Sequence, residues 1–450
     1  MKNRVFVERC SDYSSNNIEK ALDSFDDLFA ENIKPGEIVV LKPNWIAPHH
    51  KYNPDVWEPI ITHPNFITGV IKKVLEHLKN SGKIIIADAP QTDSSFNEII
   101  AKMPLEEWKK IGNAKGIEIE VLDLRDHEWV SKGDLTIARK KLPGDPLGSV
   151  DYNLGNVSEF DGHNPSSKGY YGADYNIQET TLAHTNGNHI YRLSRTVIKA
   201  DVFINLPKMK THKKAGISCS LKNLVGINTY KNFLPHHTEG TPSMGGDQFP
   251  NNNLRNVSEL ILLQYFKNFL LRYEKYSRYM IPIKRLGRIL FGETKNTIRS
   301  GNWYGNDTLW RTILDINKLL LYGNPDGSLK EANPDHRKKY ISFIDGIISG
   351  KGNGPEACDS LNSKIIIGGN NPVSVDCVAA KLMGFDYLKI PSIANAFKIR
   401  HLPIVDFSYG EIEVFSKTVN HYNASLLEIP KEKCFHFRPH FGWIGHIESH

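Results

Sequence analysis

The chain has 450 residues, too many for one ordinary hydrophobic core, so we expect one large α/β domain with an insertion, or two lobes. Its hydrophobic fraction of 40% is that of a globular protein and excludes a largely disordered chain. The 56 Lys and Arg residues nearly balance the 50 Asp and Glu residues. The net charge therefore gives no reason to expect a nucleic-acid partner.

The cysteines stand far apart in the sequence. There are five, without a C-x-x-C pair: Cys10, Cys219, Cys358, Cys377 and Cys434. This spacing argues against an iron–sulfur cluster or a zinc ribbon and favours reduced thiols. The N-terminal segment lacks the apolar core of a secretory signal, and no stretch approaches the roughly eighteen apolar residues of a spanning helix. We therefore predict a cytoplasmic protein.

The segment 1–130 is predicted to form an N-terminal α/β lobe. Residues 37–41 and 83–87 are short β-branched runs, and the apolar positions of 66–78 recur between them at helical spacing. A second helix and strand are expected at 95–114 and 117–124. This alternation predicts an α/β fold with mixed or mostly parallel sheets and covering helices.

Polar side chains follow the two strands of this lobe. Lys42 and Asn44 come just after the first strand, and Asp88 ends the second. Ligands of open α/β sheets bind outside the carboxyl ends of the strands, so these residues are candidates for substrate contact, with Asp88 as a base or metal ligand. His63 precedes a helix whose first turn suits Pro64, and it either caps that helix or contacts an anion.

Residues 131–194 interrupt the alternation. They are rich in Gly, Asn, Asp, Ser and Tyr, which predicts long loops or a small β appendage. The α/β pattern resumes in 195–239 and again in 336–430, which we expect to form a second lobe that faces the first across a cleft. Residues 431–450 form an aromatic and His-rich tail.

A helical insertion of different character is predicted at 240–335. Between 267 and 288, Lys and Arg alternate with aromatic and aliphatic residues. Such a composition suits peripheral contact with the inner face of the membrane, or a lipid-linked phosphate. The alternative is a helical hairpin that packs on the body of the protein and turns a basic face to solvent.

The densest run of charged residues is INLPKMKTHKKAGISCSLKNLVGIN, at 204–228. Pro207 disfavours a helix after the apolar strand. In an extended segment the side-chain period of two places Lys208, Lys210 and His212 on one face. Three cationic or titratable groups would then converge.

Lys222 and Asn223 come one short segment later, followed by Gly226. Their ammonium and amide groups can lie beside those of Lys208, Lys210 and His212. Because clustered lysines repel one another, a phosphate or carboxylate ligand would offset the cost of this arrangement. A solvated basic loop is the alternative interpretation.

The C-terminal block adds carboxylates and glycines. Asp345 is expected at a strand end and precedes a run that contains Gly352 and Gly354. Glycines at this density let a backbone approach phosphate oxygens, although a tight turn explains them equally well and no Walker or G-x-G-x-x-G pattern is present. Asp376, in the first turn of a helix, either favours the helix dipole or binds a divalent metal.

Several blocks, taken in order, resemble the bacterial and archaeal family called domain of unknown function 362. They are LKPNW, ITHPNFITGVIKKVLEHLKNSG, ADAP, INLPKMKTH, SLKNLVG, IDGIISGKGNGP and NNPVSVDCVAAKLMGFD. The resemblance covers roughly residues 36–90, 195–235 and 340–400. Many relatives carry a ferredoxin-like module with four-cysteine motifs, from which this chain departs. The T-H-P helix start is also distantly similar to the lactate racemase family, which implies an active site between two α/β lobes; the nickel cofactor of that family is not carried over.

The leading hypothesis is an enzyme of open reaction class that acts on a phosphorylated or carboxylated metabolite, with a divalent cation as a candidate cofactor. The basic insertion favours a lipid-linked substrate in cell-envelope polysaccharide biosynthesis. We assign catalysis to Lys210, His212, Asp88 and Asp345, substrate binding to Lys42, Asn44, His63, Lys208, Lys222, Asn223, Gly352 and Gly354, and a metal to Asp376. Two alternatives stay open: an iron–sulfur or redox-associated maturation factor, and a non-catalytic membrane-surface or anion-binding module.

Overall fold

The computed structural model describes residues 3–132, 135–163, 165, 169–174, 176–251, 258, 265 and 297–449. Its main sheet is built from β1 (Arg4–Arg9), β2 (Ile38–Pro43), β3 (Lys83–Asp88), β4 (Glu118–Asp123), β10 (Val202–Leu206), β11 (Lys208–His212), β12 (Gly216–Ile217), β14 (Lys339–Asn353), β15 (Ala357–Gly369), β16 (Glu413–Phe415) and β17 (Ala424–Ser425). The strand order is β17-β16-β1-β15-β14-β10-β2-β3-β4, and β11 pairs with β14 and β12.

The centre of this sheet is parallel. β14, β10, β2, β3 and β4 pair in parallel along the chain of neighbours, whereas β15 pairs antiparallel with β14 and with β1. The predicted α/β fold with a mostly parallel sheet and covering helices is therefore confirmed. Strands from both predicted lobes hydrogen-bond within this one sheet, so β2 and β10 are direct neighbours.

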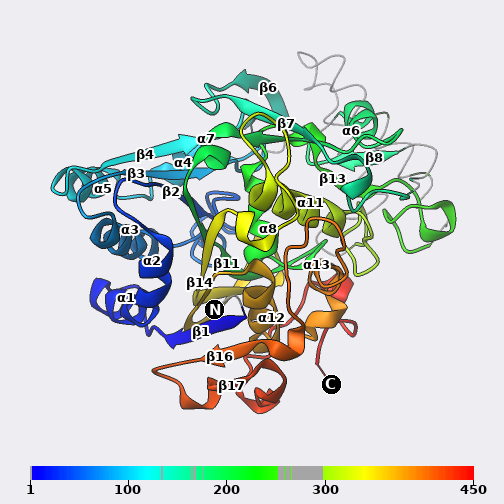
Figure 1. The fold of residues 1–450 in the computed structure, drawn as a ribbon. Helices are drawn as coiled ribbons and strands as arrows, with labels where there is room; N and C mark the ends of the chain where they lie inside the picture. The colour runs from blue at the N-terminus through cyan, green and yellow to red at the C-terminus, as the bar shows by residue number, and fades with distance from the viewer. Residues whose placement is uncertain are drawn as a thin grey trace.

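Helices cover both faces of the sheet (Figure 1). One face carries α1 (Ser15–Leu22), α2 (Asp26–Asn32), α3 (Pro64–Leu78) and α5 (Leu105–Asn113), and the other carries α7 (Arg195–Lys199), α8 (Ser220–Asn223), α11 (Leu309–Tyr322), α12 (Pro372–Leu382) and α13 (Pro391–Ala396). Alternate strand residues serve the two cores: Val39 and Leu41 face the first, and Val40 faces the second. Burial on both faces explains why these strands are almost continuously apolar.

The segment predicted as loops or a small β appendage forms short two-stranded sheets. They pair β5 (His127–Lys132) with β6 (Leu135–Lys141), β7 (Ser149–Asn153) with β9 (Ile190–Ser194), and β8 (Tyr170–Gly172) with β13 (Pro235–Thr238). Two short helices, α4 (Phe96–Ile100) and α6 (Ile177–Ala183), lie in sequence between β3 and β4 and between β8 and β9, respectively.

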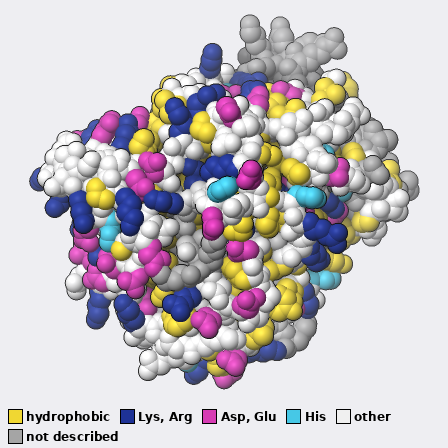
Figure 2. All heavy atoms as spheres, in the orientation of Figure 1, with side chains coloured by type: hydrophobic (Ala, Val, Ile, Leu, Met, Phe, Trp, Pro, Cys, Tyr) yellow, Lys and Arg dark blue, Asp and Glu magenta, His cyan; other side chains and the backbone are white. Residues whose placement is uncertain are grey.

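The predicted insertion is described only in part. Its helix α11 is buried along nearly its whole length against α8 and α13. The basic stretch 267–288, which carries the predicted membrane contact, lies outside the described residues. Among the helices that the structure describes, none combines the length and the apolar composition that crossing a bilayer requires. On the face shown in Figure 2, basic and acidic side chains are interspersed, as expected for a small net charge.

Candidate functional site

A cavity of about 420 Å³ lies beyond the carboxyl ends of β2 and β3. The chain runs from β2 to β3 on one side and later places β10 on the other side of β2, so the cavity is at a point where the strand order reverses. Open α/β sheets bind ligands at such points. In the described part of the chain, the charged side chains of its lining are Lys42, Lys51, Lys213, Lys214, Lys222, Lys231, Arg299, Asp88, Asp93, Asp174 and Glu356.

An ion pair joins the ends of the two strands. Lys42 Nζ lies 2.7 Å from Asp88 Oδ1, and the two side chains are 1% and 4% exposed. The second carboxylate oxygen of Asp88 accepts a hydrogen bond from the backbone N–H of Trp45 at 2.8 Å. Burial lowers the pKa of Lys42, and the adjacent carboxylate opposes this shift. The pair is thus a proton donor and acceptor of balanced charge in the cavity wall.

Amide side chains connect this wall to a deeper lysine. Asn223 Oδ1 accepts from Asn44 Nδ2 at 3.0 Å, and Asn223 Nδ2 donates to Asn205 Oδ1 at 2.7 Å. Lys210 Nζ donates to Asn44 Oδ1 at 3.0 Å and to the carbonyl of Ile60 at 2.5 Å. Burial lowers the pKa of Lys210 to about 8. Asn44 and Asn223 line the cavity, whereas Lys210 lies behind them and contacts the cavity through Asn44.

Lys222 of α8 lines the cavity and has no acceptor among the residues that the structure describes. Its Nζ makes no hydrogen bond or ion pair with any residue that the structure describes. By contrast, Lys231 Nζ donates to the carbonyls of Ala89 at 2.7 Å and Asn228 at 3.2 Å. Burial, with repulsion from Lys42 and other nearby lysines, lowers the pKa of Lys222 to about 7. Near neutral pH this group therefore exists as both ammonium and free amine.

His212 contributes a neutral imidazole to the cavity. Its Nδ1 accepts hydrogen bonds from the backbone N–H groups of Lys214 and Ala215, both at 3.1 Å. Because Nδ1 is an acceptor, the ring proton belongs on Nε2. Burial and the charge of Lys222 hold the pKa of His212 well below its usual value. His212 is therefore a hydrogen-bond donor rather than a cation.

The loop after β11 is held by the C-terminal tail. Trp443 Nε1 donates to the carbonyl of Lys213 at 2.8 Å. Lys213 Nζ lies 3.5 Å from Glu356 Oε2, and both residues line the cavity. The aromatic tail predicted at 431–450 thus packs against the loop that supplies one cavity wall.

Two predicted residues, Lys208 and Asp345, form a separate ion pair outside the cavity. Lys208 Nζ lies 2.8 Å from Asp345 Oδ2, and both side chains are fully buried. Tyr13 OH bridges them, donating to Asp345 Oδ1 at 2.8 Å and accepting from Lys208 at 2.8 Å. Asp345 lies within β14 rather than at a strand end, because β14 continues to Asn353. The pair joins β11 to β14, since these two residues are register partners.

His63 caps α3, one of the two roles considered for it. Its Nδ1 accepts from Asn65 N at 3.1 Å, and its backbone N–H donates to Asp345 Oδ2 at 3.0 Å. The ring stacks on Tyr13 with centroids 3.6 Å apart, and burial lowers its pKa to about 4. His63 does not line the cavity, and it extends the Tyr13–Asp345–Lys208 network instead.

The glycine-rich run is a strand end and turn. The N–H of Gly352 donates to the carbonyl of Arg438 at 2.7 Å, and that of Gly354 donates to Gly352 at 2.8 Å. A Cβ at Gly354 would lie 2.0 Å from the carbonyl oxygen of Thr211, so this glycine permits close packing against β11. These N–H groups are used within the protein, and neither glycine lines the cavity.

Asp376 caps a neighbouring helix. Its two carboxylate oxygens accept from the backbone N–H groups of Ser220 at 2.6 Å and Leu221 at 2.9 Å, at the start of α8. Burial raises the pKa of Asp376 to about 7. It positions the helix that carries Lys222 and lies outside the cavity lining. In the described residues, no group of three or more His, Cys, Asp or Glu side chains is arranged to hold a metal ion.

Comparison with known proteins gives a family and several distant solved structures. The family model described as "Domain of unknown function (DUF362)" matches residues 155–381. No curated protein matches the chain. A protein from Thermotoga maritima has 12% identity and a TM-score of 0.30, over 74% of this chain and 50% of that one. The lactate racemase apoprotein from Thermoanaerobacterium thermosaccharolyticum has 12% identity and a TM-score of 0.31, over 84% of this chain and 57% of that one. The chain thus spans about half the length of each of these two proteins.

Proposed function

Since this chain belongs to the DUF362 family, whose description names no activity, we propose a function from the cavity itself. The protein binds a small anionic metabolite, phosphorylated or carboxylated, and acts on it as an enzyme. The predicted link to a lipid-linked cell-envelope substrate rests on the composition of 267–288 and stays a prediction.

The observation that carries this proposal is the position of Lys222, whose amine lies without an acceptor in a cavity wall rich in lysine. The described lining contains seven lysine and arginine side chains and four carboxylates. One of these carboxylates, that of Asp88, is paired with Lys42. Lys222 has no acceptor among the described residues. An anion that accepts from Lys222 and from His212 Nε2–H would satisfy both donors, and charge-assisted bonds of this kind are the stronger ones.

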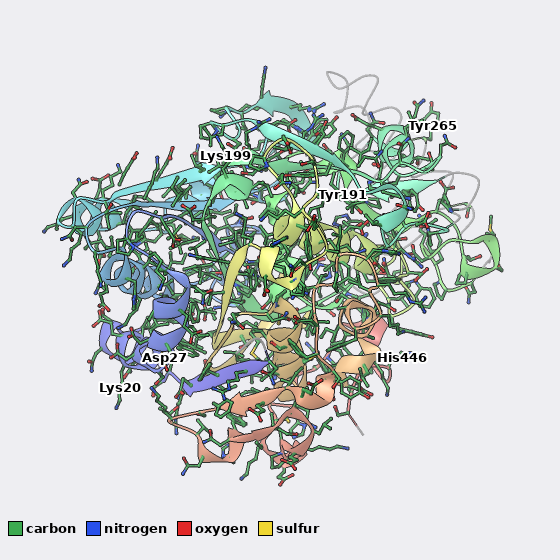
Figure 3. All side chains as sticks on the ribbon, in the orientation of Figure 1. Lys20, Asp27, Tyr191, Lys199, Tyr265 and His446 are labelled. Carbon is green, nitrogen blue, oxygen red and sulfur yellow. The ribbon has the colours of Figure 1, made fainter. Side chains whose placement is uncertain are left out.

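Replacing Lys222 by methionine should abolish most anion binding. Loss of a charge-assisted contact of about 1.5–3 kcal/mol weakens affinity by roughly tenfold to a hundredfold. The measurement is the rise in unfolding midpoint with added sulfate, phosphate or citrate, since a ligand of the folded state stabilises it. Lys20→Met is the matched control, because Lys20 is exposed on α1 at the periphery of the molecule (Figure 3). The proposal would be refuted if sulfate raised the unfolding midpoint equally in the natural chain, in Lys222→Met and in Lys20→Met.

Sulfate affinity should fall as pH rises from about 6 to about 8, by up to about tenfold, because Lys222 loses its proton over this interval. Sulfate keeps its charge, and the pKa of His212 is held too low to contribute. Burial lowers the pKa of Lys231 to about 7, so a smaller dependence should persist in Lys222→Met. The stability of the ligand-free protein has the opposite pH dependence. Between about pH 7 and pH 10 Lys222 is protonated in the unfolded chain and neutral in the folded one, so the free energy of unfolding rises with pH. Affinity that is constant with pH would contradict the role given to Lys222.

A further inference from the structure

Lys222 is partly buried and differs from the buried amines of this region in what surrounds it. Asp88 holds the ammonium of Lys42, and backbone carbonyls hold that of Lys231. Lys210 is held by Asn44 and the carbonyl of Ile60. An amine held by acceptors has its protons stabilised and its lone pair unavailable. Among the described residues, Nζ of Lys222 has no such acceptor, so its lone pair is accessible from the cavity.

The charges around Lys222 oppose its protonation. The nearby ammonium groups of Lys42, Lys210 and Lys213 act in this direction together with burial, and the Asp88 carboxylate only partly offsets them. Desolvation and neighbouring cations are the means by which proteins turn a lysine into a nucleophile at neutral pH. A lysine that served only to hold an anion would gain nothing from this environment, because its charge is its function.

We propose that Lys222 is a nucleophile that forms an imine with a small substrate carrying a carbonyl group next to its anionic group, such as a 2-oxo acid or a ketose phosphate. This inference rests on the proposed anion-binding function and narrows its substrate class. A simple anion such as sulfate accepts from Lys222 and from the Nε2–H of His212. In the carbonyl substrate the anionic group accepts from Lys213 and His212 instead, and Lys222 bonds to the carbonyl carbon.

The chemistry balances without an oxidant or a further reactant. The neutral Nζ attacks the carbonyl carbon and forms a carbinolamine, whose oxygen retains the former carbonyl electrons. One amine hydrogen moves to that oxygen and makes it a hydroxyl group. The hydroxyl group leaves as water once it gains a second proton, and a C=N bond then replaces the C–O bond in a protonated imine. The ammonium of Lys42 can protonate the leaving hydroxyl group, because it lines the same cavity and shares its proton with Asp88 at 2.7 Å. The protonated imine then returns one proton to Lys42, so the amine and the carbonyl compound give one imine and one water overall.

Reductive trapping tests the imine directly. The full chain is incubated with sodium cyanoborohydride and either pyruvate or dihydroxyacetone phosphate, and the modified lysine is located by peptide mass spectrometry. We expect a reduced secondary amine on Lys222 with at least one probe, at a rate that rises as pH increases through about 7, since the neutral amine reacts. The two probes distinguish a carboxylate from a phosphate as the anionic group. Lys20→Met should be trapped like the natural chain.

Lys222→Arg separates the imine from simple anion binding. Arginine keeps the positive charge and cannot form the imine, so this variant should retain sulfate binding within about tenfold and lose all trapping at position 222. Sulfate binding by the natural chain, with adducts no more frequent on Lys222 than on exposed Lys20, would overturn the imine and leave the proposed function standing. Absence of both sulfate binding and trapping would overturn the two proposals together.

Discussion

Asp345→Ala is expected to lower the free energy of unfolding by about 3–5 kcal/mol, because it strands the buried ammonium of Lys208. Lys208 is fully buried, and without the carboxylate its remaining hydrogen-bond partner among the described residues is the hydroxyl of Tyr13 at 2.8 Å. The same change removes the acceptor of the His63 backbone N–H at the start of α3. Urea unfolding followed by circular dichroism measures the loss.

The stranded lysine also predicts a change with pH. Burial already lowers the pKa of Lys208, and Asp345 is the main group that opposes this shift. In Asp345→Ala the folded pKa falls further below 10.5, so the unfolded chain binds more protons and stability rises with pH more steeply than in the natural chain. Lys208→Met is the control, since it leaves Asp345 with the donors Tyr13 and His63 and should cost less. A loss below about 1 kcal/mol for Asp345→Ala would show that the network adds little, as most surface pairs do.

The residues at strand ends could be predicted from the sequence because the information is local. A β-branched run shows where a strand ends, and the polar residues just after it lie at the sheet edge where ligands bind. Lys42, Asn44 and Asp88 follow this rule and line the cavity. Asn223 and Lys222 also lie in this lining, as their position after the second strand block suggested.

The common face of β11 was predictable, but its surroundings were not. Lys208, Lys210 and His212 alternate as expected, and yet each meets a different partner along the strand. Lys208 contacts Tyr13, which is 195 residues away in sequence, and only His212 reaches the cavity. Side-chain period gives the direction of a residue, whereas its neighbour depends on which distant helix or loop covers that position.

The glycine-rich run shows the same limit. Its density suggested a phosphate loop, but β14 continues through it as one arm of a long hairpin with β15. A Cβ at Gly350 would lie 2.7 Å from Cβ of Cys358, so contact with the paired strand explains this glycine. The sequence did not single out Lys231, because it belongs to no dense cluster of charged residues. Its place in the cavity wall depends on the hydrogen bond that its Nζ donates to the distant backbone carbonyl of Ala89.

Gly226→Ala is expected to disrupt the cavity more than its single added methyl group suggests. A Cβ at this position would lie 2.2 Å from Asp88 Oδ1 and 2.7 Å from Lys42 Nζ, closer than real Cβ contacts allow. The glycine belongs to the 3-10 turn Leu224–Ile227 that follows α8, and its carbonyl accepts from Ala89 N at 2.8 Å. Either the ion pair must open or the turn must move and carry Lys222 with it.

Both responses impair the same function. Overpacking should cost about 1–3 kcal/mol of stability, and sulfate affinity should fall at least about tenfold because Lys42 and Lys222 lose their relative positions. Gly410→Ala is the control, since a Cβ there meets nothing nearer than 3.8 Å. The result that contradicts this prediction is a Gly226→Ala variant whose free energy of unfolding and sulfate affinity both equal those of Gly410→Ala. The close approach of the turn to the Lys42–Asp88 pair would then not be what positions Lys222.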